Sequence, residues 1–97
     1  MIATIVTFTA PDGFEPEGLR GIADNSRQKF EGLPGLRSKM FSVDADGRRA
    51  RNVYLWEDEA KAHEFFDDDL KSLVTKLYGV APTIEFVEVL GYVDNGH

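Results

Sequence analysis

The sequence contains no cysteine. Disulfide bonds, thiolate metal ligands and a cysteine nucleophile are therefore all excluded, whatever the fold. The chain also has no apolar run of about 18 residues, the length that a helix needs to span a bilayer. Its first residues, Met1–Phe8, lack the basic flank and the small-residue cleavage site of a secretory signal peptide. From these absences we expect a cytoplasmic protein with no membrane partner.

Positive charge is scarce as well, because 17 Asp or Glu residues stand against 11 Lys or Arg, a formal net charge of −6. Affinity for nucleic acid comes largely from Lys and Arg side chains that displace counterions, so DNA and RNA are not expected partners. The charges are unevenly placed: Glu57–Asp69 carries seven acids and one Lys, and basic residues gather at Arg37, Lys39, Arg48, Arg49 and Arg51. Either the basic segment pairs with the acidic one, which we favour, or it rims a pocket for an anionic substrate.

What the chain does contain is the material for one small domain, residues 1–97. Hydrophobic residues make up 42% of the sequence and aromatic residues 11%, which is enough for a packed core. A domain of this size buries only roughly 60–65% of its unfolded surface, so a second copy of the chain would add useful burial.

The spacing of the apolar residues predicts six elements, separated by short breaks rich in Gly, Pro and Asp. Strands are expected over Ile2–Thr9, Leu36–Val43, Arg51–Glu57 and Thr83–Val93, and helices from Glu15 to the break at Gly32–Gly35 and from Glu59 to Gly79. The turn Asp44–Gly47 should join the two middle strands into an antiparallel hairpin, and Asp58 should cap the second helix. The order β-α-β-β-α-β predicts an α+β fold: a ferredoxin-like sandwich with an antiparallel sheet and two helices on one face.

Two of the predicted strands are apolar on both faces. Val53–Trp56 is apolar at every position and Glu85–Leu90 nearly so, whereas a sheet with one wet face should alternate. The helices can cover only one face, so we expect the open face to pack against an identical subunit as a homodimer. A monomer with a few exposed aromatic residues is the less favoured alternative.

Three stretches of sequence carry a resemblance to a known family: NVYLWEDEAKAHEFF at 52–66, GLPGLRSKMF at 32–41 and YGVAPTIEFVEV at 78–89. Together they resemble the YdhR-like monooxygenases of the dimeric α+β barrel superfamily, which also holds the antibiotic-biosynthesis monooxygenases. The resemblance implies a homodimer whose two sheets form a shared barrel. It also implies a pocket in each subunit, between sheet and helices, for a small aromatic or hydrophobic ligand.

Catalytic members of that superfamily have an Asn and, four residues later, a Trp, matched here by Asn52 and Trp56. Their Tyr, six residues beyond the Trp, is replaced here by Ala62, with His63 beside it. Asn52, Trp56 and His63 are accordingly the expected catalytic residues, with the Asn amide donating to a substrate anion and the His as the base.

Tyr54, Phe65 and Phe66 are the expected substrate-binding residues. Positions 52, 54 and 56 share one face of a strand and span about 13 Å, so Tyr54 should lie in one row with Asn52 and Trp56. No metal and no cofactor are expected. Haem is not expected because the positions of the Asn, Trp and His of the haem-degrading relatives are occupied here by Thr7, Phe65 and Thr75. A metal ion is not expected at Asp67–Asp69, because consecutive helical side chains point about 100° apart and cannot converge on one ion.

Each catalytic candidate also has a purely structural interpretation. A Trp at the end of a strand is often a packed core residue, and an Asn at the start of a hairpin strand is often hydrogen-bonded to backbone or water. A His beside the apolar stripe of a helix is often exposed to solvent. The first functional hypothesis is a cofactor-independent monooxygenase that acts on a small aromatic or quinol-like substrate with O₂. The alternative is a non-catalytic homodimer that binds a small hydrophobic ligand in the same pocket, which the missing Tyr favours. An isomerase or a stress-related dimer of the same fold is a third.

Overall fold

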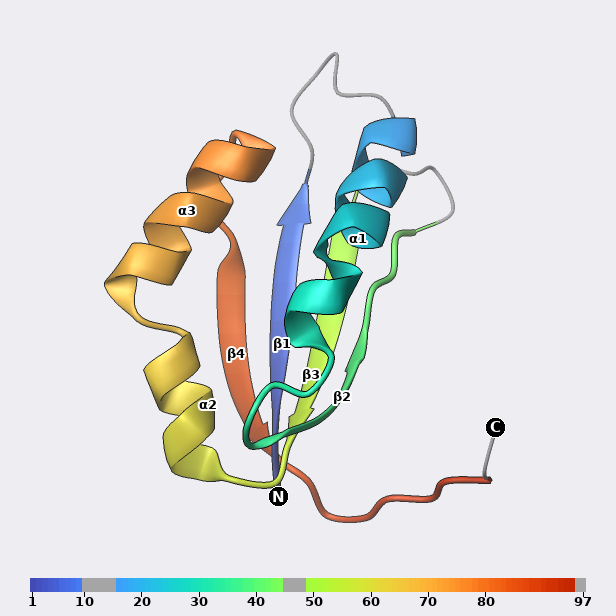
Figure 1. Ribbon diagram of the computed structural model, residues 1–97, viewed down its shortest axis with the longest axis vertical. Helices are drawn as coiled ribbons and strands as arrows, with labels where there is room; N and C mark the ends of the chain where they lie inside the picture. The colour runs from blue at the N-terminus through green and yellow to red at the C-terminus, as the bar shows by residue number, and fades with distance from the viewer. Residues whose placement is uncertain (10–15, 45–48, 96–97) are drawn as a thin grey trace.

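The computed structural model describes residues 1–9, 16–44 and 49–95. Its elements follow one another in the order β1 (Ile2–Thr9), α1 (Pro16–Phe30), β2 (Leu36–Met40), β3 (Arg49–Trp56), α2 (Glu59–Phe65), α3 (Asp68–Tyr78) and β4 (Thr83–Glu88). The strands form one antiparallel sheet in the order β2-β3-β1-β4, with the helices on one side of it (Figure 1). The α+β, ferredoxin-like fold class is confirmed. None of the described helices is both long and apolar enough to span a membrane.

The predicted second helix is in fact two helices, α2 and α3. The backbone leaves the helical region at Phe66 (φ −93°, ψ 56°), where its N–H still bonds the carbonyl of Ala62. Asp67 then begins a new helix, because its carboxylate accepts a hydrogen bond from the Leu70 N–H at 2.9 Å. The run Asp67–Asp69 therefore contains a helix cap. At the start of α2 the prediction is confirmed, since Asp58 accepts from the N–H groups of Ala60 and Lys61.

Three strand boundaries differ from the predicted ones. β4 ends at Glu88 rather than Val93, because Glu88 pairs with Ile2, at the start of β1, and beyond it the chain has no strand to pair with. β2 ends at Met40, and Val43 makes only an isolated bridge to Ala50 at the start of β3. β3 spans Arg49–Trp56 instead of Arg51–Glu57. The antiparallel hairpin of β2 and β3 is confirmed, although residues 45–48 of its predicted turn lie outside the described residues.

The helix-covered face of the sheet carries the core. Its side chains come from alternate positions of β1 and β3, paired in register so that Thr4 lies opposite Tyr54 and Val6 opposite Asn52. The buried core consists of Val6, Phe8, Ala50, Tyr54, Trp56, Ala62 and Phe66. The predicted row of Asn52, Tyr54 and Trp56 on one face is confirmed, with all three side chains at most 6% exposed.

The other positions of the same strands form an open face, which no helix covers (Figure 1). We use this name for the apolar patch of Ile5, Met40, Val53, Leu55 and Val87. In the single chain Met40 is 56% exposed and Val87 39%, whereas Leu55 is only 8% exposed. The open face thus leaves hydrocarbon in contact with water.

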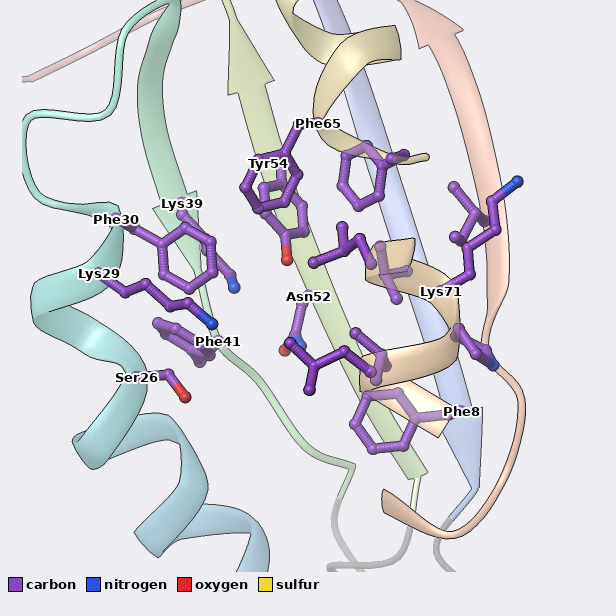
Figure 2. Close-up of a pocket in the computed structure, with 17 residues that line it drawn as sticks. Phe8, Ser26, Lys29, Phe30, Lys39, Phe41, Asn52, Tyr54, Phe65 and Lys71 are labelled. Atoms are coloured by element: carbon purple, nitrogen blue, oxygen red, sulfur yellow. The ribbon is translucent and has the colours of Figure 1, made fainter. Parts of the chain in front are cut away.

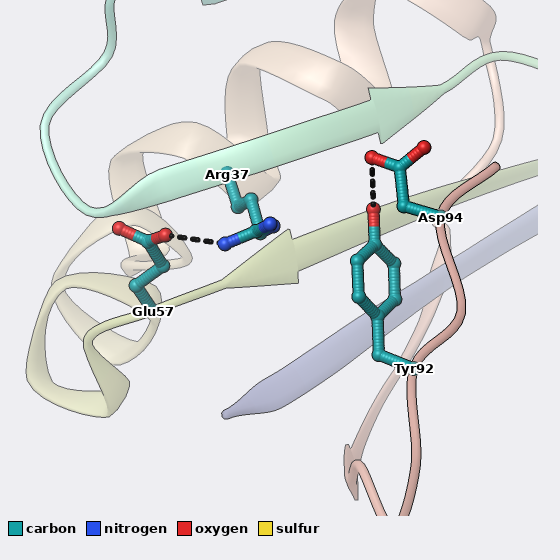
Figure 3. A network of polar contacts seen from close by, with 4 residues as sticks. All are labelled: Arg37, Glu57, Tyr92 and Asp94. Atoms are coloured by element: carbon teal, nitrogen blue, oxygen red, sulfur yellow. Dashed lines mark hydrogen bonds and ion pairs between the residues drawn. The ribbon is translucent and has the colours of Figure 1, made fainter. Parts of the chain in front are cut away.

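An extended segment, residues 89–95, follows β4 and runs away from the helices (Figure 1). It is held by Tyr92, whose ring lies 5.1 Å from the guanidinium of Arg37 and whose hydroxyl donates to Asp94 at 3.4 Å (Figure 3). Arg37 in turn donates to Glu57 at 3.0 Å, which joins the start of β2 to the end of β3. Leu90 and Val93 of this segment are 94% and 84% exposed.

Candidate functional site

A cavity lies between the helix-covered face of the sheet and the helices (Figure 2). Its floor is formed by β1 and β3, with Val6, Phe8, Asn52 and Tyr54, and its walls by α1, β2, α3 and the residues around Phe65. About 60 Å³ of it is open to the centre of a water molecule. The split between α2 and α3 shapes one wall, because it places Phe65 and Phe66 at the end of one helix and Leu70 at the start of the next.

Asn52 is the polar group on the floor of this cavity. Its side chain is only 6% exposed, and within the described part of the chain it makes no hydrogen bond. Figure 2 shows the amide directed into the space between α1 and α3. The buried side-chain atoms that lack a partner among the described residues are Thr4 Oγ1 and Trp56 Nε1, so the Asn52 amide is not sealed inside the protein and reaches the water-accessible space of the cavity. The amide is therefore available to a ligand, as donor and as acceptor.

The aromatic residues predicted to bind substrate do lie at the cavity. Tyr54 is 4.9 Å from Phe66 and 5.9 Å from Phe65, measured between ring centroids. Phe30 of α1 approaches Tyr54 at 5.8 Å from the other side, with the two rings edge to face. These contacts, each in the favourable range for aromatic pairs, make one continuous wall of rings.

Trp56 lies behind that wall. Its ring stacks on Tyr54 at 6.1 Å with an interplanar angle of 5°, it is 1% exposed, and it is not among the residues that line the cavity. The indole Nε1 is buried and has no hydrogen-bond partner within the described residues. In this chain Trp56 sits where it can support Tyr54, and a ligand in the cavity meets Tyr54 first.

His63 lies outside the cavity lining as well. Its imidazole stacks on Phe86 at 4.3 Å, and Nε2 is 3.7 Å from the carboxylate of Glu59 one turn earlier. The side chain is 53% exposed. The neighbouring Ala62, where the resembling enzymes have a Tyr, is fully buried in the core and offers no polar group.

Lys39 is a cavity residue that sequence reasoning did not single out (Figure 2). Its ammonium lies 3.4 Å from the ring centroid of Phe30, 4.1 Å from Phe41 and 4.3 Å from Tyr54. We call these three rings the aromatic cage. Burial, together with repulsion from the nearby Lys29, lowers the pKa of Lys39 to about 7.

A β-bulge explains why Lys39 faces the cavity. The register between β2 and β3 shifts between Leu36 and Ser38, so that Leu36 lies opposite Trp56 and Lys39 opposite Tyr54. Strict alternation from Leu36 would turn Lys39 to the open face, because a one-residue slip moves a side chain across the sheet. The sequence contained one sign of this position, because the basic residues at 37–51 were expected either to pair with the acidic segment or to rim a pocket. In the structure Arg37 pairs with Glu57, and Lys39 lines the cavity.

Metal ligands do not gather anywhere in the described part of the chain: it contains no group of three or more His, Asp or Glu residues placed to hold an ion. The described residues that line the cavity include Lys29, Lys39 and Lys71 but no carboxylate. The cavity is therefore positive, in a chain whose formal net charge is −6. Such a site favours an anionic or electron-rich ligand over a cation.

Comparison with solved structures shows the fold. The ActVA-Orf6 monooxygenase of Streptomyces coelicolor, solved with the ligand nanaomycin D, is 21% identical with a TM-score of 0.72, over 98% of this chain and 92% of its own. SnoaB, a cofactor-independent oxygenase from Streptomyces nogalater, is 12% identical with a TM-score of 0.72, over 95% of each chain. A protein of unknown function from Nitrosomonas europaea is 16% identical with a TM-score of 0.77, over 99% of this chain and 95% of its own. No family model and no curated protein sequence matches the chain. The chain thus has the fold of the antibiotic-biosynthesis monooxygenases, and at these identities the likeness carries the fold alone.

Proposed function

We propose that this chain is a cofactor-independent monooxygenase of the YdhR-like kind, which oxidises a small aromatic or quinol-like substrate with O₂. The observation that carries the proposal is the unpartnered amide of Asn52, 6% exposed on the floor of a cavity walled by aromatic rings. Two proteins of the same fold are named as a monooxygenase and a cofactor-independent oxygenase, which supports the same class of chemistry.

The chemistry needs an electron-rich carbon acid, for which anthrone is a suitable test substrate. Loss of a proton gives an anion that can react with O₂ directly. The reacting CH₂ carbon loses both hydrogens, one oxygen atom becomes its carbonyl oxygen, and the other leaves as water. The four electrons that reduce O₂ come from the substrate, so the reaction needs no electrons from a metal or a flavin. The protein must bind the ring, stabilise the anion and exclude bulk water.

The residues of the cavity divide these tasks. Asn52 donates an amide N–H to the oxygen of the substrate anion, while Tyr54, Phe65 and Phe66 hold the substrate ring. Trp56 keeps Tyr54 in place through their stacked contact. His63, outside the cavity lining, is given no step.

Oxygen uptake with anthrone tests the proposal. The wild-type protein, stripped of metal by a chelator, should consume oxygen in proportion to the anthrone oxidised. Asn52→Ala should lower the rate about 100-fold, the usual cost of removing one anion-stabilising donor. Asn25→Ala, on the exposed side of α1, is the matched control and should leave the rate unchanged. Absence of uptake with every quinol-like substrate, or an equal rate in Asn52→Ala, would reject the oxygenase. A stoichiometric haem or flavin spectrum on titration would contradict the cofactor-free part.

A second function is favoured by the buried Ala62 in place of the Tyr and by the position of Trp56 behind the cavity. It is a non-catalytic homodimer that binds a small hydrophobic ligand in the same cavity. Binding of an aromatic ligand that depends on Tyr54 and is accompanied by no oxygen uptake would select this function over the first.

The proposal includes a homodimer formed through the open face. Ile5, Val53 and Val87 lie there without a helix to cover them, and a second copy offers the same apolar patch by two-fold symmetry. Sedimentation at working concentration should give twice the chain mass of 10.9 kDa. A stable single subunit would refute the dimer.

A further inference from the structure

The amine of Lys39 has no counter-charge in the described part of the chain. Ion pairs between described residues include Arg27–Glu31, Arg37–Glu57, Lys61–Glu64 and His63–Glu59. All of them lie on the outer surface. Lys39 instead contacts three ring faces, and no carboxylate is among the described cavity residues. A half-buried ammonium without an anion is unfavourable, so the site is complete only with a negatively charged ligand or with a neutral amine.

The titratable groups that face Lys39 come from each element packed around it. Lys29 lies on α1, Lys71 on α3 and the Tyr54 hydroxyl group on β3. Burial, and after it repulsion from Lys29, opposes the charging of Lys39 and lowers its pKa. At neutral pH Lys39 therefore exists in both forms: an amine that accepts a proton, and an ammonium that the aromatic cage stabilises.

The acceptor lies beside the group proposed to hold the substrate anion. Lys39 pairs across the sheet with Tyr54, and Asn52 precedes Tyr54 by two positions on the same face of β3. Successive side chains on one face of a strand are about 7 Å apart, the width of one aromatic ring. A phenol that lies against Tyr54 can thus direct one edge to the Lys39 amine and another to the Asn52 amide (Figure 2).

We propose that Lys39 is the proton acceptor of this cavity, which takes a phenol or an enol, removes its O–H proton and holds the resulting anion against the Lys39 ammonium. This rests on the proposed function and names the substrate class of the same site. The step is a proton transfer: the O–H bond breaks and its electron pair stays on oxygen, while the lone pair of Nζ forms the new N–H bond. Nothing is oxidised or reduced, and the pair left behind is an ion pair inside the aromatic cage.

Binding of para-nitrophenol tests the inference without any oxygen chemistry. The probe absorbs strongly in the visible only as phenolate, so its spectrum reports the proton directly. Near pH 7, where Lys39 is partly the neutral amine, wild-type protein should bind the probe and raise the phenolate band above that of the free probe at the same pH. Lys39→Met, which fills the cage with an uncharged chain of similar length, should weaken binding ~10-fold or more and leave the residual bound probe protonated. Lys61→Met removes the same charge from the exposed surface of α2 and should match wild type.

A second probe keeps the test independent of any variant. The methyl ether, para-nitroanisole, has the same ring but no proton to give, and wild-type protein should bind it ~10-fold or more weakly than the phenol. Equal binding of ether and phenol, or an unchanged phenolate band in Lys39→Met, would overturn the inference. So would an equal loss in Lys61→Met, because the effect would then come from overall charge.

The outcome separates this inference from the proposed function. Phenolate binding that depends on Lys39, in a protein that consumes no oxygen with anthrone, supports the inference and removes the oxygenase. Oxygen uptake that is lost in Asn52→Ala, together with phenolate binding that is unchanged in Lys39→Met, supports the oxygenase and rejects the inference about Lys39.

Discussion

The two faces of the sheet are built from the same strands and differ in what they leave unsatisfied. On the helix-covered face, Asn52 and Lys39 bring polar groups without protein partners into an aromatic surrounding. On the open face, Ile5, Val53 and Val87 leave only hydrocarbon uncovered. Unmet polar groups in a cavity are met by a small polar ligand, whereas unmet hydrocarbon on a flat surface is met by another surface. This contrast is the basis of both proposals, a reaction on the helix-covered face and a dimer through the open face.

The sharpest way to break this contrast is to remove Phe30, which holds α1 over the cavity. Its ring contacts Phe41, Tyr54 and Phe65 at 5.8–5.9 Å, and the Lys39 ammonium at 3.4 Å. Phe30→Ala should lower the free energy of unfolding in urea by about 3 kcal/mol, the lower end of the range for a core ring, because Phe30 is partly buried against the core. Met40→Ala on the open face should cost the single chain less than about 0.5 kcal/mol at a concentration where the dimer is dissociated. Equal losses would mean that the open face is already packed within one chain.

A charge on the open face should act on assembly and spare the fold. Val87 is 39% exposed in the single chain, so Val87→Asp leaves its carboxylate hydrated in the monomer and buries it only in the dimer. We expect the dimer to weaken by roughly 2 kcal/mol, or ~30-fold in dissociation constant, by sedimentation equilibrium. Thr83→Asp lies on the same face of β4 at its exposed end and is the matched control. An unchanged dissociation constant for Val87→Asp would place the interface elsewhere.

The smallest expected effect is a pH dependence of stability from Lys39. Folding lowers the pKa of Lys39 from 10.5 to about 7, so between these values the unfolded chain binds more protons and stability rises with pH. Lys39→Met has no such group. It should be more stable than wild type by about 1–2 kcal/mol near pH 6, after allowance for the partial solvent exposure of the amine. The advantage should shrink as the pH rises through 7 and vanish near 10.5. Arg51→Met on the exposed outer surface should show no such trend; a flat difference for Lys39→Met would mean that its amine stays charged in the fold.

Much of the fold was predictable because it is written in local patterns. The strand Ile2–Thr9 was located to the residue, since its β-branched run stops at a Pro-Asp-Gly sequence. The Asp58 cap and the shared face of Asn52, Tyr54 and Trp56 also follow from neighbours in sequence. Such features depend on periodicity and on side chain to backbone contacts within one turn or one strand.

The misplaced boundaries depend on what a segment meets in space. Phe66 interrupts an otherwise continuous apolar stripe because Asp67 offers a cap, and the stripe alone gives no sign of the break. β4 stops where β1 begins, a limit set by the partner strand and not by its own apolar residues. The depth of Trp56 and the outward position of His63 are likewise set by neighbours from other elements.

The sequence by itself determined the strand order along the chain, the fold class, and the shared face of Asn52, Tyr54 and Trp56, because all of these are periodic properties of contiguous residues. Only the tertiary structure decided that Lys39 belongs to the cavity. The Glu57 N–H donates to the Gly35 carbonyl at 2.9 Å, and between Leu36 and Ser38 the pairing then slips by one residue. That slip turns the lysine from the open face to the aromatic cage. It arises from how β2 meets β3, which no count along one strand can contain.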